Sequence, residues 1–96
     1  MRERTDGEGF ATRAIHAGER PDPVTDAHAT PIFATATFAF DTAAEKEDAV
    51  DRALAWDPTS YFYSRTGNPT NRALEEKVAA LEGAEDAVVS SSGMAA

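Results

Sequence analysis

The sequence predicts an α/β fold, and three observations near its C-terminal end indicate this class. Leu74, Val78 and Leu81 follow one another at i, i+4 and i+7, which predicts a helix with one buried face. The run Asp86–Ser90 (DAVVS) is typical of a short buried strand. A Ser/Gly-rich turn and the first residues of another helix follow over 91–96. Helix, strand, loop and helix in this order form the opening unit of an α/β sheet.

The first part of the chain predicts a tail, a short helix and an arm. Met1–Gly9 is charged and contains glycine, so we expect a disordered tail. Phe10–Ala17 predicts about two helical turns that end at Gly18. Glu19–Asp41 contains three prolines and no helical period, and its apolar stretches favour extended backbone. A long segment of this kind is uncommon inside a compact domain, so we expect an arm that packs on a missing part of the chain, on another subunit, or on both.

A second helix should start at Asp41 or Thr42, because Thr42 and Glu45 have the spacing of a capping box. The sequence from Trp56 to Pro58 should end it. Tyr61–Arg65 is expected to be extended. The helix with the Leu74 face should be capped by Asn68 or Thr70 at its start and by Gly83 at its end. The predicted domains are therefore a tail over 1–9, an arm and helix over 10–60, and the start of an α/β domain over 61–96.

Composition limits the classes of partner. The 96 residues include 17 acidic and 9 basic side chains, for a net charge of −8. This balance disfavours nucleic acid and anionic membranes, which require basic patches. There are no cysteines, and no run approaches the ~20 apolar residues of a membrane span. We expect a soluble, cytoplasmic protein.

Tyr63 and Arg65 form the first candidate anion site. Two residues apart in an extended segment, they would point to the same face. A phenol and a guanidinium that converge in this way suit a phosphate group. The alternative is an ordinary edge strand, in which the tyrosine packs and the arginine is solvated.

The turn Ser90–Ala96 forms the second candidate anion site. The unpaired N–H groups at a helix start attract anions, glycine permits close approach, and serine hydroxyls can donate hydrogen bonds. Ser/Gly turns also join strands to helices without binding anything, so both interpretations stay open. His16 and His28 lie in different segments without ligand-like spacing, and the sequence predicts no metal site and no catalytic residue.

Several dispersed segments together resemble the Cys/Met-metabolism (trans-sulfuration) family of PLP-dependent enzymes. This family includes cystathionine γ-synthases and γ-lyases, methionine γ-lyases and O-acetylhomoserine sulfhydrylases. The matching segments occur in the family's order with family-like spacing: TRAIHAG (12–18), PD (21–22), TPIF (30–33), TATF (35–38), YFYSRTGNPT (61–70), LE (74–75), LEG (81–83) and SSGMA (91–95). Dispersed matches in a conserved order are far more specific than any one motif.

The resemblance implies a cofactor, a fold and residue roles. The cofactor is pyridoxal 5'-phosphate (PLP), and the fold is an N-terminal arm plus the opening of the large PLP-binding domain of a fold-type I (aspartate aminotransferase-like) enzyme. Tyr63 and Arg65 are expected to bind the cofactor phosphate of a neighbouring subunit. Ser92, Gly93 and Met94 are expected to bind the phosphate of the chain's own cofactor. The family assembles as homo-oligomers, as tetramers built from dimers, which would explain the arm, and acts on small amino-acid substrates.

The resemblance also implies what these residues lack. The family's Schiff-base lysine lies far downstream, and neither Lys46 nor Lys77 matches its position. We therefore expect an incomplete fold and an inactive, truncated chain. The motifs lean toward a cystathionine γ-synthase or γ-lyase, with a sulfhydrylase or methionine γ-lyase as the alternative. Two other classes stay open: a non-catalytic chain that pairs with a full-length paralogue, and a small independent module that binds a phosphate-bearing ligand.

Overall fold

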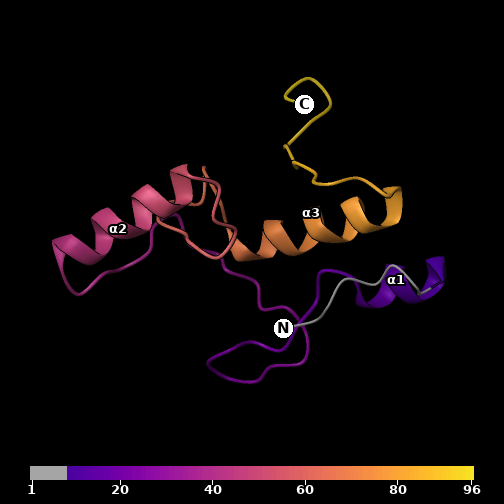
Figure 1. The fold of residues 1–96 in the computed structure, drawn as a ribbon, viewed down its shortest axis with the longest axis horizontal. Helices are drawn as coiled ribbons and strands as arrows, with labels where there is room; N and C mark the ends of the chain where they lie inside the picture. Colours follow the sequence, from indigo (N-terminus) through magenta and orange to yellow (C-terminus); the bar gives the residue numbers. More distant parts are fainter. Residues whose placement is uncertain (1–8) are drawn as a thin grey trace. The chain divides into compact units, whose positions relative to one another are not determined.

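A computed structural model describes residues 9–96. These residues contain three helices, α1 (Phe10–His16), α2 (Ala43–Leu54) and α3 (Pro69–Glu82), joined by irregular segments (Figure 1). They divide into two compact units, which we call the first unit (9–31 with 73–96) and the second unit (32–72). The predicted tail lies almost entirely outside the described residues. No helix among residues 9–96 has the length and apolar character needed to cross a lipid bilayer.

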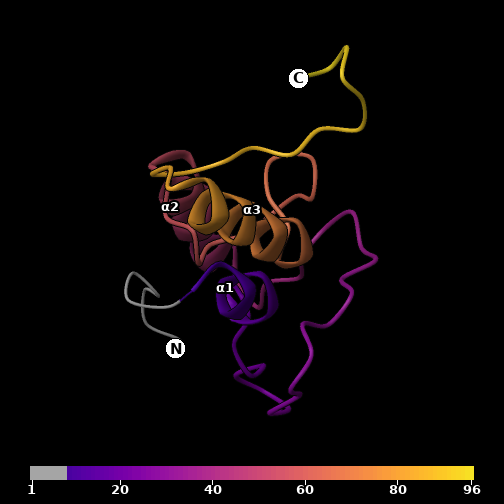
Figure 2. The same cartoon turned by 90° about the vertical axis from the view of Figure 1, so that its right-hand side faces the viewer.

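In the first unit, α1 lies along α3 (Figures 1 and 2). The α1 helix ends as predicted at Gly18, whose φ of +76° is a backbone conformation that favours glycine. A Cβ atom at this position would lie 2.5 Å from the carbonyl oxygen of Ala73. Gly18 therefore allows the chain after α1 to approach the backbone of α3 more closely than any other residue would.

Polar contacts hold the first unit together. Arg20 forms an ion pair of 2.6 Å with Glu76, and Lys77 forms one of 3.0 Å with Glu19. Arg13 donates a 3.1 Å hydrogen bond to the carbonyl oxygen of Ala80. These contacts lie on the side of α3 that carries Glu76, Lys77 and Ala80.

The predicted buried face of α3 is therefore wrong. Leu74 and Val78 are 51% and 38% exposed, while Ala79 is the buried residue of the helix, at 6%. The α1 segment packs across the adjacent face of α3, where small and charged side chains meet it. Helical spacing identified the helix, but the packing partner decided which of its faces is covered.

The ends of α3 follow the predicted capping chemistry. The side-chain oxygen of Asn68 accepts a 2.8 Å hydrogen bond from the amide of Thr70, with Pro69 in the first turn. At the other end, Gly83 has a φ of +67°, and the amide of Ala84 donates to the carbonyl of Ala79 at 2.9 Å.

The segment after α3 forms no strand. Asp86–Ser90 is without ladder hydrogen bonds, and Val88 is 85% exposed, although Ala87 and Val89 are half-buried. A strand requires a neighbouring strand for its backbone hydrogen bonds, and residues 9–96 offer none beside it. The predicted buried strand is therefore wrong for the described part of the chain, although the alternation of burial along it is that of extended backbone.

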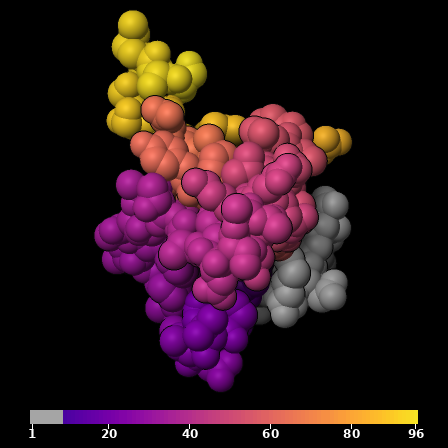
Figure 3. Space-filling view, turned by 90° about the vertical axis from the view of Figure 1, so that its left-hand side faces the viewer, coloured from indigo at the N-terminus to yellow at the C-terminus, as the bar shows by residue number. Residues whose placement is uncertain are grey.

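In the second unit, α2 starts at the predicted capping box. The hydroxyl of Thr42 accepts a 3.1 Å hydrogen bond from the amide of Glu45, whose carboxylate in turn accepts one of 3.2 Å from the amide of Asp41. Most of α2 is exposed, and its surface faces the viewer in Figure 3. Ala49 is its buried residue, and the carbonyl oxygen of Ala49 accepts a 2.7 Å hydrogen bond from the buried hydroxyl of Ser60.

The loop after α2 is stabilised around Asp57. Its carboxylate accepts hydrogen bonds of 2.7 Å and 2.9 Å from the hydroxyl and amide of Thr59, and Arg52 lies 3.5 Å away. The Thr59 hydroxyl and amide, with a smaller contribution from Arg52, hold the pKa of Asp57 below its usual value because they favour the ionised form.

The apolar part of the predicted arm finds a partner within the second unit. Phe33 donates its amide to the Thr70 hydroxyl at 2.9 Å and accepts at its carbonyl from the Asn68 side chain at 2.9 Å. Thr37 and Tyr63 form an isolated antiparallel bridge. The expectation that the arm finds its partner only on a missing part of the chain or on another subunit is therefore wrong for Phe33 and Thr37. Among the large apolar side chains of residues 31–40, Ile32 stays uncovered, at 84% exposure.

Candidate functional site

Tyr63 and Arg65 come together in the second unit. The guanidinium carbon of Arg65 lies 4.9 Å from the centre of the Tyr63 ring, which is the geometry of a cation–π contact. The backbone between them turns, because the amides of Thr66 and Gly67 donate to the Tyr63 carbonyl at 3.0 Å and 3.1 Å. The predicted extended conformation is therefore wrong for Ser64 and Arg65. A turn, and not the alternation of a strand, brings the two side chains together.

Neighbouring segments fix the position of this turn. The amide of Ser64 donates to the carbonyl of Ala36 at 2.8 Å, and the Ser64 hydroxyl donates to the carbonyl of Thr35. The rings of Phe38 and Tyr61 lie 6.0 Å apart, within the range of a favourable aromatic contact. The arm segment thus holds the turn that carries Tyr63 and Arg65.

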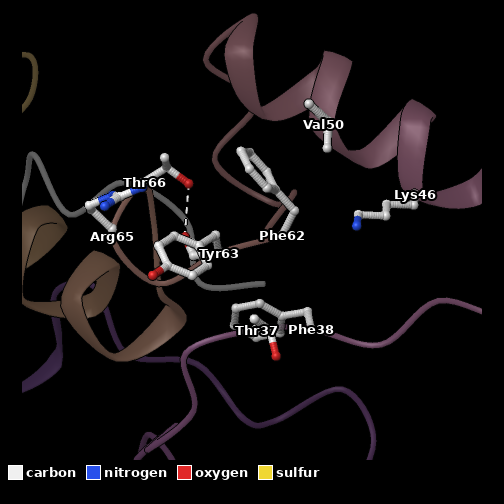
Figure 4. A pocket seen from close by; sticks show the side chains of 8 residues that line it. All are labelled: Thr37, Phe38, Lys46, Val50, Phe62, Tyr63, Arg65 and Thr66. Atoms are coloured by element: carbon white, nitrogen blue, oxygen red, sulfur yellow. Dashed lines mark hydrogen bonds between the residues drawn. The ribbon is translucent and has the colours of Figure 1, made fainter.

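A pocket of about 360 Å³ opens beside the pair (Figure 4). Tyr63, Arg65 and Thr66 line one part of it, and Lys46 lines another part from α2. Its remaining lining residues are mostly apolar: Thr37, Phe38, Val50 and Phe62. The volume lies within the range of sites for small organic ligands.

The donors of the pair are available to a ligand. Neither the Tyr63 hydroxyl nor the Arg65 guanidinium has a hydrogen-bond or ion-pair partner among residues 9–96, and the Arg65 side chain is exposed. A guanidinium presents several N–H groups that match the oxygens of a phosphate or carboxylate, and a phenol adds one further donor. The pair can therefore bind an anion and fix its orientation.

Lys46 was not predicted as part of this site. The sequence contained one usable signal, since Lys46 and Val50 are four residues apart and so share one face of the predicted helix. Nothing local indicated that this face would border Tyr63, because that contact depends on how α2 packs against the turn. Thr37 and Phe38 were predicted only as parts of the arm, because their place in this pocket also depends on how the segments pack.

The second predicted site, Ser92, Gly93 and Met94, lies in the first unit. The amide of Ala95 donates to the carbonyl and hydroxyl oxygens of Ser92, both at 3.2 Å, so residues 92–95 form a turn. The predicted helix start is wrong here, because this i→i+3 contact does not continue as an α-helix. The amides of Gly93 and Met94 have no acceptor among residues 9–96, and Met94 is 98% exposed.

The described residues give no indication of a metal centre. Within 9–96, no three His, Asp or Glu side chains are placed so that they could hold a metal ion. The chemistry that this geometry allows is therefore anion binding at Tyr63 and Arg65, with a second set of free amides at Gly93 and Met94.

Comparisons with known proteins find a matching family model and several similar sequences. The model of the family described as Cys/Met metabolism PLP-dependent enzyme matches residues 11–96. A probable cystathionine gamma-synthase of Herpetosiphon aurantiacus is 48% identical over 88 residues, which are 92% of this chain and 24% of that protein. An L-methionine gamma-lyase of Porphyromonas gingivalis and an O-acetyl-L-homoserine sulfhydrylase of Corynebacterium glutamicum are each 47% identical over 92% of this chain, and over 21% and 19% of their own lengths.

A solved structure shows the same local fold. The crystal structure of metB from Corynebacterium glutamicum matches with a TM-score of 0.69 and 42% identity, over 92% of this chain and 20% of that one. The chain thus spans about a fifth to a quarter of the length of the proteins it matches.

Proposed function

Because this chain belongs to the Cys/Met metabolism family of PLP-dependent enzymes, we propose that it is the N-terminal part of a trans-sulfuration enzyme. The proposed reaction exchanges or eliminates the γ-substituent of a homoserine ester or of cystathionine, as in a cystathionine γ-synthase or γ-lyase. Identities of 48%, 47% and 47% to a synthase, a methionine lyase and a sulfhydrylase support the family without separating its types. A sulfhydrylase or methionine γ-lyase type is the alternative.

The observation that carries the proposal is the pairing of Tyr63 with Arg65 beside a pocket. The cofactor supplies an electron sink when bound, and the protein supplies binding and orientation. The phenol and guanidinium would donate hydrogen bonds to its phosphate group, and both donors are free for this purpose. Their fit to a phosphate is good, because the pocket carries positive charge and has no acidic residue among its lining residues.

We assign Ser92, Gly93 and Met94 to a second phosphate contact. The free amides of Gly93 and Met94 and the Ser92 hydroxyl support this assignment. In the proposed homo-oligomer, Tyr63 and Arg65 would bind the phosphate of a neighbouring subunit's cofactor, while Ser92–Met94 would bind that of their own subunit. One chain would then contribute to two active sites.

The reaction is tested with the product of the complete open reading frame that encodes these residues. Saturated with PLP, it should form cystathionine from a homoserine ester and cysteine, or cleave cystathionine. Release of methanethiol from methionine would instead indicate the lyase alternative, and homocysteine from a homoserine ester and sulfide would indicate the sulfhydrylase. Absence of turnover with every one of these γ-substituted amino acids would contradict the proposal.

Residues 1–96 by themselves are proposed to bind phosphate without catalysing the reaction. Lys77 is engaged with Glu19 and with the carbonyl of Ile15, so it is held in place by contacts within its own unit. Neither Lys46 nor Lys77 matches the position of the family's Schiff-base lysine, so the 96-residue chain should show no turnover in the same assays. Turnover by this chain alone would refute this part of the proposal.

A non-catalytic role is the second candidate. The exposed Leu74 and Val78 of the first unit favour it, since they leave apolar surface on which another chain could pack. Mixing the 96-residue chain with a full-length family member and measuring co-elution tests this role. Separate elution of the two proteins would argue against it.

A further inference from the structure

Two cations in the described part of the chain, Lys46 and Arg65, stand apart from the other basic side chains. Neither Lys46 nor Arg65 has a hydrogen-bond or ion-pair partner for its charged group among residues 9–96. Other basic side chains in the described region are engaged with oxygen atoms of the chain: Arg13, Arg20, Arg52 and Lys77. In a chain with 17 acidic and 9 basic residues, a basic side chain has many potential partners. The isolation of these two cations therefore requires an explanation.

Both isolated cations line the same pocket. Lys46 reaches it from α2, and Arg65 reaches it from the turn that also carries Tyr63. Figure 4 shows the ammonium end of Lys46 directed from its helix toward the interior, with Tyr63 and Arg65 on the other side. The pocket is thus bordered by two positive charges and a phenol, and none of its lining residues is acidic.

Two like charges at one pocket repel each other, and the repulsion is relieved when an anion binds between them. An anion with two negative charges balances the pair better than a carboxylate with one. The apolar walls, formed by Phe38, Val50 and Phe62, suit a flat or compact apolar group attached to that anion. A volume of about 360 Å³ accommodates one ring-sized ligand.

We propose that Lys46 is a further binding residue of this site, for the same phosphate group that Tyr63 and Arg65 would bind. Lys46 would contact the phosphate from the side opposite Tyr63 and Arg65. Its long flexible side chain allows the ammonium to follow the ligand, while the planar Arg65 guanidinium fixes the orientation. This inference rests on the proposed phosphate-binding role of Tyr63 and Arg65 and adds a residue to it.

The test uses the 96-residue chain and phenyl phosphate as the probe. Pyridoxal phosphate is avoided in this experiment, because its aldehyde reacts with lysine amines at any accessible position. Binding is measured by NMR titration of the backbone amides at low ionic strength, where surface electrostatics are least screened. Benzoate, which carries one charge on the same ring, serves as the comparison ligand.

Four variants separate the contributions of Lys46, Arg65 and net charge to the binding of phenyl phosphate. Lys46→Gln should weaken phenyl phosphate binding about tenfold, the effect of losing one charge-assisted hydrogen bond, and Lys46→Arg should restore most of it. Arg65→Gln should weaken binding at least as much. Arg52→Gln is the matched control: it removes one positive charge from the same helix, but Arg52 is already paired with Asp48 and lies outside the pocket lining. Its affinity should equal that of the unmodified chain.

Each outcome bears on a different claim. A loss in Lys46→Gln that Arg52→Gln does not share, together with weak binding of benzoate, supports the inference. If Arg65→Gln weakens binding and Lys46→Gln does not, the role of Lys46 is refuted while that of Arg65 stands. Equal losses in Lys46→Gln and Arg52→Gln would reduce the effect to net charge and also refute it. No binding by the unmodified chain, or no effect of Arg65→Gln, would overturn both this inference and the proposed phosphate site.

Because Lys46 is exposed and glutamine has nearly the same helix propensity as lysine, the variant should fold like the unmodified chain. Far-ultraviolet circular dichroism checks this point before the titration.

Discussion

Replacing Gly18 by alanine should separate α1 from α3. The Cβ atom of alanine would lie 2.5 Å from the carbonyl oxygen of Ala73 and 3.0 Å from the amide nitrogen of Lys77. Both are backbone atoms of a helix, so neither can move without displacing the helix itself. The contacts that depend on this close approach include the burial of Ala17 and the ion pair between Arg20 and Glu76.

Two costs add up in this substitution. A residue other than glycine in the left-handed region, here a φ of +76°, costs about 1–2 kcal/mol. Forcing extra volume against packed backbone typically costs a further ~1–3 kcal/mol. The expected loss in the free energy of unfolding is therefore about 2–5 kcal/mol.

The chain offers two matched controls for these costs. Gly83 has a φ of +67° but no atom within 4 Å of the added Cβ, so Gly83→Ala should show the backbone cost alone, about 1–2 kcal/mol. Gly9 has neither a positive φ nor a neighbour within 4 Å, but it is the N-cap of α1, so Gly9→Ala should cost only about 0.5–1 kcal/mol through the weaker cap. The difference between Gly18→Ala and Gly83→Ala measures the close approach itself.

Urea denaturation followed by circular dichroism at 222 nm provides the free energies. Hydrogen exchange of the Ala17 amide, which donates to the Arg13 carbonyl at 2.9 Å, reports locally on the end of α1. We expect faster exchange at Ala17 in Gly18→Ala and unchanged exchange there in Gly83→Ala. Equal effects of the two substitutions on both measurements would refute the packing of Gly18 against α3.

Three further predictions concern the second unit. Asn68→Asp keeps an oxygen for the cap of α3 but removes the donor to the Phe33 carbonyl, so urea denaturation should show a loss of about 2–3 kcal/mol; an unchanged midpoint would contradict this buried contact. Ser60→Ala should cost about 1–2 kcal/mol, because its buried hydroxyl donates to the backbone of α2, and Ser60→Thr should retain part of that stability. Thr59→Val should raise the pKa of Asp57 toward its ordinary value, as measured by carboxyl carbon NMR. Because the folded pKa of Asp57 is lowered, its contribution to stability is present above the unfolded pKa and is lost as pH falls through the folded pKa; a titration curve unchanged by Thr59→Val would contradict the hydroxyl's role.

The family and the helices could be predicted from the sequence because the signals are local. A capping box, a proline in the first helical turn and a glycine after the last depend only on residues a few positions apart. Thr42, Asn68 and Gly83 therefore mark the ends of α2 and α3 where the structure has them. The motif of Tyr63 and Arg65 identified the family in the same way, from residue types at fixed spacing.

Contacts between distant segments were decided by the tertiary structure. The sequence could not show that Gly18 would approach Ala73, or that the adjacent face of α3 would be covered while Leu74 stayed exposed. Both depend on where α1 packs. The predicted strand at Asp86–Ser90 failed for a related reason, since a strand exists only with a partner beside it.

The candidate site was likewise determined in part by the sequence and in part by the tertiary structure. The sequence by itself determined that a phenol and a guanidinium stand two residues apart in a family motif. Only in the tertiary structure does the backbone turn at Ser64, so that the guanidinium carbon of Arg65 lies 4.9 Å from the centre of the Tyr63 ring. Only there does Lys46 of α2 line the same pocket. Spacing along the chain fixes which side chains a short segment carries, but charges from separate segments converge only when those segments pack.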